Sequence, residues 1–173
     1  MITRILILAC CFFITATTFS QSACETEYAI YRNEFKQKNY DEAIKSWRKV
    51  LKICPDYNEN TFADGPKIYQ YMIKQDQDNI LLYLDTLMMI YDLRIQYFGK
   101  REYVLGKKGT DLLKYDISRY DEAYEMLNTS ITYSGNATLP TVLVSYFKAV
   151  VKKEKNSTDF TTQDVLDAYV ISS

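Results

Sequence analysis

The sequence predicts an all-α protein built from consecutive antiparallel helical hairpins, and three observations support this fold class. Apolar residues recur at helical spacing from Tyr28 almost to the end of the 173-residue chain. Gly and Pro are scarce, with 5 and 3 residues, which disfavours a β protein with many turns. Turn signals divide the chain so that helix pairs are expected to begin near residues 25, 65, 101 and 138. This repeat of roughly 36 to 40 residues is typical of an α-solenoid of about four hairpins, with an irregular helical bundle as the alternative.

The first hairpin is the most clearly marked of the four. A turn at Lys38-Asn39 separates its two helices, and Pro55 ends the second helix because proline cannot donate the next backbone hydrogen bond. Each helix carries an apolar stripe at helical spacing, as expected when one face is buried. The stripes consist of Tyr28, Tyr31 and Phe35 in the first helix, and of Ala43, Ile44, Trp47, Val50, Leu51 and Cys54 in the second.

Helix start and stop signals predict the second and third hairpins. Asp64-Gly65-Pro66 is expected to open the first helix of the second hairpin, since proline in a first turn has no hydrogen bond to lose. Asp78 is expected to cap the long helix that follows, and Gly99 is expected to end it. The third hairpin is expected over residues 101–115 and 120–131, closed by Gly135.

The fourth hairpin is predicted from similar signals. It is expected to begin at Thr138, with Pro140 in the first turn of its first helix. A polar break over residues 152–158 is expected to end that helix. Thr161 and Asp164 are then expected to open a last apolar helix.

The first twenty residues are predicted to be a signal peptide, with cleavage near Ser20/Gln21, followed by a repeat domain over residues 24–173. Arg4 supplies a positive charge ahead of a continuous apolar run from Ile5 to Ile14, and small polar residues follow. This run is too short to span a bilayer, which needs about 20 residues. A buried N-terminal helix or a short membrane anchor is the alternative. No later segment reaches transmembrane length without charges, so a soluble mature protein is expected.

The composition excludes several classes of function. The chain has no His, which removes the commonest general base and any Ser-His-Asp or Cys-His pair. The charges are balanced, with 21 Lys and Arg against 22 Asp and Glu. The sequence therefore has no basic stripe of the kind that would indicate binding to nucleic acid. We therefore predict no catalytic residue, no metal site and no cofactor. A hydrolase or lyase that uses only carboxylates or Tyr is the alternative.

Three sets of residues that could be read as functional clusters have simpler interpretations. Gly106 and Gly109 lack the flanking pattern of a phosphate-binding loop and are expected to pack against a neighbouring helix. The acidic pairs Asp41-Glu42 and Asp121-Glu122 fall in first helical turns, where negative charge complements the helix dipole. A basic cluster is interpreted as a solvated helix end, and it consists of Lys148, Lys152, Lys153 and Lys155.

Residues 36–55 resemble the second half of a tetratricopeptide repeat. In that family's pattern, Tyr40 is the aromatic residue that opens helix B, and Ala43 is the small residue that lets the two helices approach. Trp47 is the aromatic residue one turn later, and Pro55 is the terminating proline. The resemblance implies a right-handed superhelix of stacked hairpins. A partial second copy of the motif consists of Tyr120, Ala123 and Leu127.

The sequence also departs from this family's pattern. Where the first helix of a repeat usually has a small residue, the first repeat has Tyr31 and the third has Asp111. As a whole the chain is similar to exported tetratricopeptide proteins of Gram-negative bacteria, which have a Cys near the mature start and a Cys-Pro at the end of the first hairpin. Such proteins usually continue into further repeats, whereas this sequence stops at Ser173, so a truncated or incomplete chain is one interpretation.

Cys24 and Cys54 are predicted to form a disulfide bond. In an antiparallel hairpin, the first turn of helix A lies beside the last turn of helix B, and these turns contain Cys24 and Cys54. Export would provide an oxidising compartment. Two unpaired buried thiols are one alternative. The other is a lipoprotein with a lipidated Cys24, although Gln21 stands where a lipobox normally has an apolar residue.

The resemblance implies a non-catalytic scaffold of the bacterial cell envelope that binds a protein or peptide, in the periplasm, at the outer membrane or as a secreted protein. Solenoids of this family bind their partners on the concave face, which is lined by the A helices. The alternative is a structural subunit or fragment of a larger envelope or secretion assembly, without a ligand groove of its own. The implied partner-binding residues are Tyr28, Arg32, Phe35 and Lys36 in the first repeat and Tyr115 in the third; ordinary core packing is the alternative for Tyr28 and Phe35.

Overall fold

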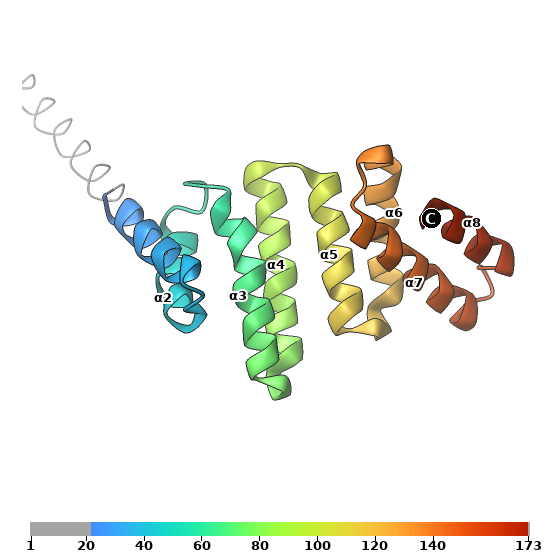
Figure 1. Cartoon of the computed structure of the whole chain (residues 1–173), viewed down its shortest axis with the longest axis horizontal. Helices are drawn as coiled ribbons and strands as arrows, with labels where there is room; N and C mark the ends of the chain where they lie inside the picture. Colours follow the sequence, from blue (N-terminus) through green and yellow to red (C-terminus); the bar gives the residue numbers. More distant parts are fainter. Residues whose placement is uncertain (1–21, 173) are drawn as a thin grey trace, which may run out of the picture. The chain divides into compact units, whose positions relative to one another are not determined.

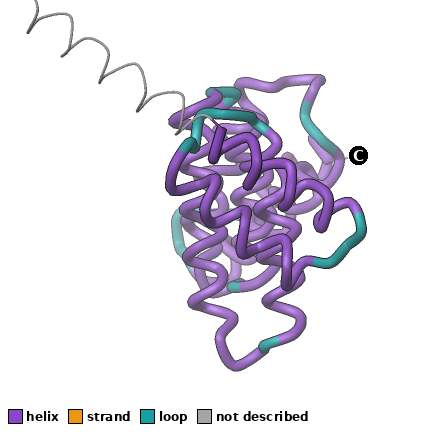
Figure 2. Tube along the Cα trace, turned by 90° about the vertical axis from the view of Figure 1, so that its left-hand side faces the viewer, coloured by secondary structure: helices purple, strands orange, loops and turns teal. Residues whose placement is uncertain are grey.

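The computed structural model describes residues 22–172, and this part of the chain is helical with short connections and no β-strand (Figure 1, Figure 2). The predicted all-α class is therefore confirmed. The predicted signal peptide and its cleavage site lie outside the described residues. After a helix over residues 22–36, the α-helices are α2 (Tyr40–Ile53), α3 (Asn60–Gln75), α4 (Ile80–Phe98), α5 (Arg101–Tyr115), α6 (Tyr120–Ser134), α7 (Pro140–Asn156) and α8 (Thr162–Ser172).

The described residues divide into two compact units, one ending at Tyr71 and the other beginning at Met72. The N-terminal unit contains a hairpin of helix 22–36 and α2, which turns at Lys38 with a left-handed φ of 63°. Trp47 is 1 % exposed, and its indole N–H donates to the Thr61 carbonyl at 2.7 Å, which joins α2 to the start of α3. The core of this unit includes Cys24, Tyr31, Ala43, Trp47, Val50, Phe62 and Ile68.

The predicted disulfide is present in this unit. Cys24 and Cys54 are bonded, with their Cα atoms 6.1 Å apart, and the bond closes a loop with a sequence separation of 30. Cys24 lies near the N-terminal end of the described helix 22–36, and Cys54 directly follows α2, as the antiparallel register requires. Because a sulfur atom in a disulfide cannot also carry a lipid, this bond disfavours the lipoprotein alternative.

The prediction that Asp64-Gly65-Pro66 opens a helix is wrong, since α3 already begins at Asn60 and Pro66 lies inside it. The side chain of Asn58 accepts a hydrogen bond from the Asn60 N–H at 2.9 Å, which satisfies one N–H of the first turn. Thr61 is fully buried, and tertiary packing therefore stabilises a helical turn ahead of the proline.

In the C-terminal unit, most helix boundaries follow their sequence signals, and the start of α4 does not. Gly99 ends α4 with a φ of 69°, and Gly135 ends α6 with a φ of 50°, as predicted. Asp78, in contrast, does not cap α4: it lies in a 3₁₀ turn, η1 (Gln77–Asn79), and α4 begins one residue after Asn79. The expected α5 boundaries are confirmed, whereas α6 continues to Ser134.

Helices α5 and α6 pack very closely, and two glycines make this possible. A Cβ atom on Gly109 would lie 2.8 Å from Cγ of Leu127 and 3.1 Å from the carbonyl oxygen of Ala123. A Cβ atom on Gly106 would lie 2.5 Å from the Ser130 hydroxyl. The expectation that both glycines pack against a neighbouring helix is therefore confirmed.

Helices α6, α7 and α8 continue the pattern in which each helix packs against the next along the chain. The predicted polar break over residues 152–158 is wrong in its first part, because α7 continues through Asn156. Thr161 and Asp164 form the predicted helix start: the Thr161 N–H donates to the Asp164 carboxylate at 2.7 Å. No helix among residues 22–172 is both long and apolar enough to cross a membrane.

Candidate functional site

The side chains predicted to bind a partner on helix 22–36 mostly contact other parts of the N-terminal unit. Arg32 forms an ion pair with the buried carboxylate of Asp64, so its charge is already neutralised within the chain. Tyr28 packs edge-on against both Tyr31 and Tyr57, with ring centroids 5.2 Å and 5.0 Å apart. Such contacts are typical of aromatic core packing.

Phe35 and Lys36 differ in their surroundings. The Phe35 ring is half-buried, packs against Tyr40 with centroids 5.5 Å apart, and has the Lys67 ammonium 5.7 Å from its centre. Lys36 is exposed. Two of the four candidates in this helix are charged, Arg32 and Lys36. Within the part of the chain that the structure describes, Arg32 forms an ion pair and Lys36 does not.

The Asp64 carboxyl is the most strongly buried acidic group of this unit. Burial raises its pKa above the ordinary value, while the hydrogen bond and the charge of Arg32 act in the opposite direction. The Tyr31 hydroxyl also contacts it at 3.5 Å, and burial together with the Asp64 charge raises the pKa of Tyr31. These partners make Asp64 an internal anchor between helix 22–36 and α3.

Tyr115, the candidate in the third repeat, lies at the end of α5. The ammonium of Lys114 is 4.6 Å from the centre of its ring and donates to its hydroxyl at 3.0 Å. Tyr115 is half-buried and does not line the groove described next. The role predicted for it remains a prediction.

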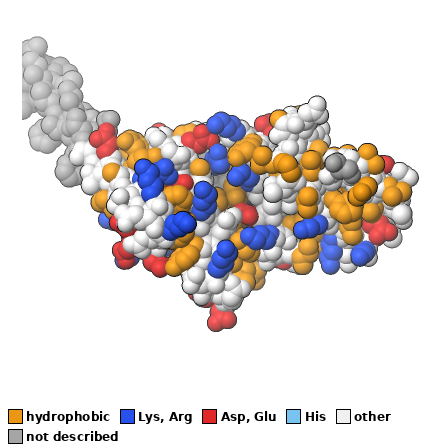
Figure 3. Space-filling view, in the orientation of Figure 1, with side chains coloured by type: hydrophobic (Ala, Val, Ile, Leu, Met, Phe, Trp, Pro, Cys, Tyr) orange, Lys and Arg blue, Asp and Glu red, His pale blue; other side chains and the backbone are white. Residues whose placement is uncertain are grey.

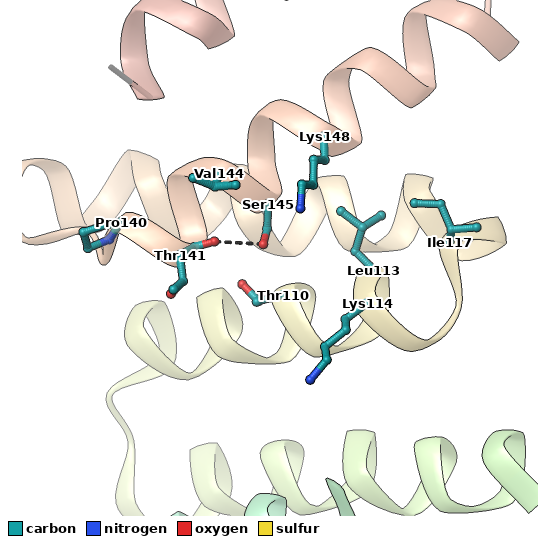
Figure 4. Close-up of a pocket in the computed structure, with 9 residues that line it drawn as sticks. All are labelled: Thr110, Leu113, Lys114, Ile117, Pro140, Thr141, Val144, Ser145 and Lys148. Atoms are coloured by element: carbon teal, nitrogen blue, oxygen red, sulfur yellow. Dashed lines mark hydrogen bonds between the residues drawn. The ribbon is translucent and has the colours of Figure 1, made fainter. Parts of the chain in front are cut away.

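The C-terminal unit contains a hollow of about 660 Å³ between α5 and α7 (Figure 4). Its lining is mostly apolar, and the exposed fractions of Ile117 and Val144 are 52 % and 47 %, which is high for aliphatic side chains. The hydroxyl of Ser145 donates to the Thr141 carbonyl at 2.8 Å, drawn as the dashed line in Figure 4. Thr110, Leu113, Lys114 and Ile117 line the hollow from α5 and the 3₁₀ turn η2 (Ile117–Arg119), and Pro140, Thr141, Val144, Ser145 and Lys148 line it from α7.

A second hollow of about 350 Å³ continues the first along α7. The two hollows share Ile117 and Lys148 and are therefore adjacent. We name them together the α5–α7 groove. The second hollow adds Phe147, Val151, Lys152 and Lys155 to its lining.

The charges that line the α5–α7 groove are all positive. Lys148, Lys152 and Lys155 lie along α7, and none of them forms an ion pair with a residue in the described part of the chain. Their neighbour Lys153 behaves differently, because it pairs with Asp121 of α6. In Figure 3, hydrophobic side chains gather over α7 and α8 with basic side chains beside them.

Sequence reasoning recognised these lysines as a cluster but interpreted them as a solvated helix end. It missed Leu113, Ile117 and Val144, because their place in the lining of one hollow depends on how α5 and α7 lie side by side. The helical period places apolar residues on a stripe, but it does not show where the stripe of one helix extends beyond its neighbour. No signal in the sequence identifies this groove directly.

The acidic pairs of the first helical turns have structural partners. Asp41 accepts a hydrogen bond from Tyr71 at 2.8 Å, and Glu42 pairs with Lys45. Asp121 pairs with Lys153, as described above, and Glu122 pairs with Arg119. Among residues 22–172, no group of three or more Cys, Asp or Glu side chains comes close enough to hold a metal ion.

No protein-family model matches this chain, and no curated protein is significantly similar to it.

Proposed function

We propose that this chain is a non-catalytic scaffold of the tetratricopeptide kind that binds a peptide or protein partner in the bacterial cell envelope. The α5–α7 groove carries this proposal, since it combines apolar lining residues with hydroxyl and ammonium groups, as recognition sites do. Packing between successive helices supports a repeat architecture, in which binding surfaces lie along stacked hairpins. The disulfide supports export, because such bonds persist in oxidising compartments.

Site-specific crosslinking in cells of the source organism tests the binding role. A photo-crosslinking amino acid replaces Val144 in the groove or, as the control, Tyr133 of α6, which is 73 % exposed and lies outside the groove lining. We expect discrete adducts from position 144 that are absent from position 133. Identical adduct patterns at both positions, or none at position 144, would contradict the scaffold role.

The export step has its own test. Residues 1–20 are fused to a reporter enzyme that is active only where disulfides form, and a matched fusion has Leu8→Arg in the apolar run. We expect activity from the first fusion and loss of activity from the second. Equal activity of both fusions, or no activity from either, would contradict export to the cell envelope.

A second candidate function is a structural subunit of a larger assembly, and the surface of α8 favours it. Leu166 and Val170 are 54 % and 74 % exposed, and Ile171 is also exposed, so one short helix has an apolar face in contact with solvent. Light scattering on the purified mature chain discriminates between the candidates. A stable monomer favours the groove-based scaffold, whereas self-association that Leu166→Glu abolishes favours the structural subunit.

A further inference from the structure

The α5–α7 groove combines an apolar floor with a row of lysines along one side. Leu113, Ile117 and Val144 contribute aliphatic surface to it, and Phe147 contributes an aromatic ring. None of the residues that line the two hollows is acidic. A ligand that fills the groove therefore meets both apolar surface and positive charge, and Lys148, Lys152 and Lys155 form no ion pair within the described residues.

The lysine row has a regular spacing. Lys148, Lys152 and Lys155 are four and three residues apart on α7, which places them on one face of the helix. At a rise of about 1.5 Å per residue, their Cα atoms are separated along the helix by about 6 Å and 4.5 Å. In an extended peptide, alternate side chains point to the same side and recur every ~6.6 Å. Carboxylates at alternate positions of such a peptide therefore match the lysine row, since lysine side chains are long enough to absorb the difference.

We propose that the α5–α7 groove binds an extended peptide segment in which acidic and apolar residues alternate. This inference rests on the proposed scaffold function and names the chemical class of its partner. The acidic side chains pair with Lys148, Lys152 and Lys155 of α7, and the apolar side chains, which point to the other side of the peptide, contact Ile117 and the end of α5. The groove follows α7 from Pro140 to Lys155, about 22 Å, which accommodates about seven extended residues.

The shape of the surface favours a peptide over an anionic bilayer or a flat protein surface. A planar surface contacts protruding side chains, whereas Leu113 and Val144 line a hollow of about 660 Å³. A single extended chain is narrow enough to enter such a hollow. The ion pairs with the lysines of α7 then add affinity and fix the register of the peptide.

Fluorescence anisotropy with defined peptides tests the inference. The probe is the fluorescein-labelled heptapeptide Glu-Leu-Glu-Val-Glu-Leu-Glu, and the comparison peptides replace every Glu by Gln or by Lys. We expect the Gln peptide to bind at least about tenfold more weakly than the Glu peptide and the Lys peptide not to bind, because each lost or reversed charge pair weakens binding. Raising the salt from 50 mM to 500 mM is expected to weaken binding of the Glu peptide only.

Charge-reversal variants locate the binding site. Lys148→Glu combined with Lys152→Glu is expected to weaken Glu-peptide binding at least about tenfold. The matched control combines Lys52→Glu with Lys74→Glu, two exposed lysines outside the groove, and is expected to bind as the parent does. Val144→Ala keeps all charges and is expected to weaken binding of the Glu and Gln peptides by the same factor. Circular dichroism of each variant shows that the helices are retained.

The possible outcomes separate this inference from the scaffold role. Equal binding of the Glu and Gln peptides, or equal effects of the groove and control variants, would show that the partner is not recognised by its acidic residues. Crosslinking from position 144 would still support a scaffold in that case. Binding to phosphatidylglycerol vesicles, without binding to the Glu peptide, would assign the lysine row to a membrane surface and overturn the inference. Self-association abolished by the groove variants would assign the groove to a second copy of the chain and likewise overturn it.

Discussion

Two helical hairpins, one in each unit of the chain, are held together by different contacts. In the N-terminal unit, helix 22–36 and α2 pack around large side chains, with Tyr31 and Trp47 almost fully buried, and a disulfide fixes their far ends. In the C-terminal unit, α5 and α6 approach closely through Gly106 and Gly109, and no covalent bond joins them.

This contrast shows which physical term stabilises each hairpin. A cross-link stabilises the first hairpin chiefly by restricting the unfolded chain. Close glycine packing stabilises the second through van der Waals contact between the helices, which depends steeply on distance. The single Trp of the chain, Trp47, lies in the first of these units, so its fluorescence reports on that unit, whereas circular dichroism reports on all helices.

Removal of the disulfide should have the largest effect. The double variant Cys24→Ser, Cys54→Ser is expected to lower the free energy of unfolding by about 3–4 kcal/mol. The disulfide joins residues with a sequence separation of 30, and without it the unfolded chain gains conformational entropy. Urea unfolding followed by Trp47 fluorescence measures this change. Reductant should reproduce the change in the parent protein and leave the double variant unaffected. A loss below about 1 kcal/mol would show that the aromatic core alone holds this hairpin together.

Gly109→Ala is expected to lower the free energy of unfolding by about 1–2 kcal/mol, because it disturbs the contact between α5 and α6. Urea unfolding followed by circular dichroism measures this change. The added methyl group would overlap both Leu127 and the backbone oxygen of Ala123, and a backbone atom cannot rotate away. This cost exceeds the gain of about 1 kcal/mol in helix propensity that Ala normally brings.

Gly106→Ala provides the matched control for this prediction. Its nearest obstacle is the Ser130 hydroxyl, at the end of a side chain that can be shortened. Adding Ser130→Ala should therefore restore part of the lost stability. The comparison between hairpins fails if Gly109→Ala stabilises the protein, because glycine would then serve no packing role there.

Tyr91 in the C-terminal unit and Tyr31 in the N-terminal unit are both buried, and they differ in the length of the hydrogen bond that each makes to a carboxylate. The Tyr91 hydroxyl donates to the Asp111 carboxylate at 2.7 Å in a buried position. Tyr91→Phe is expected to cost about 1.5–3 kcal/mol, since a hydrogen bond to a charged group is lost. Tyr31→Phe is expected to cost less than about 1 kcal/mol, because its contact with Asp64 is 3.5 Å long and Asp64 also pairs with Arg32.

Urea unfolding of both Phe variants at neutral pH measures these costs. Burial and the Asp111 charge raise the pKa of Tyr91, so its hydroxyl stays protonated under these conditions. Equal costs for the two variants would show that hydrogen-bond length does not separate the two sites.

Much of the fold follows from the sequence because it depends on local signals. Helical period, Gly99, Gly135 and Pro140 mark element boundaries that the structure confirms or shifts by a few residues. The start of α3 escaped this reasoning, since the turn ahead of Pro66 depends on the tertiary burial of Thr61 and on the contact between Asn58 and the Asn60 N–H.

The candidate sites depend on contacts between distant residues, and these were predicted less well. Arg32 pairs with Asp64, 32 residues further along the chain, and no local pattern indicates this partner. The groove in turn requires α5 and α7, which α6 separates in the sequence, to lie next to each other. The disulfide was predictable because antiparallel register alone brings Cys24 near Cys54.

The smallest expected effect concerns an ion pair across the first hairpin. Lys49 of α2 donates to the Glu27 carboxylate at 2.7 Å, and the Glu27 side chain is 19 % exposed. Hydrogen bonds from Lys49 and Ser46 lower the pKa of Glu27. Glu27→Gln is therefore expected to cost about 0.2–1 kcal/mol at pH 7.

The pH dependence gives this small effect a definite sign. Because the folded-state pKa of Glu27 is lowered, its contribution to stability is present above the unfolded-state pKa of about 4.3 and is lost as the pH falls through the folded-state value. The difference between the parent and Glu27→Gln, measured by Trp47 fluorescence in urea, should thus shrink towards zero on acidification. Glu25→Gln, an exposed change on the same helix, serves as the control. If the parent and Glu27→Gln differ equally at pH 7 and at low pH, the lost contact is steric, and charge plays no part in joining the two helices of this hairpin.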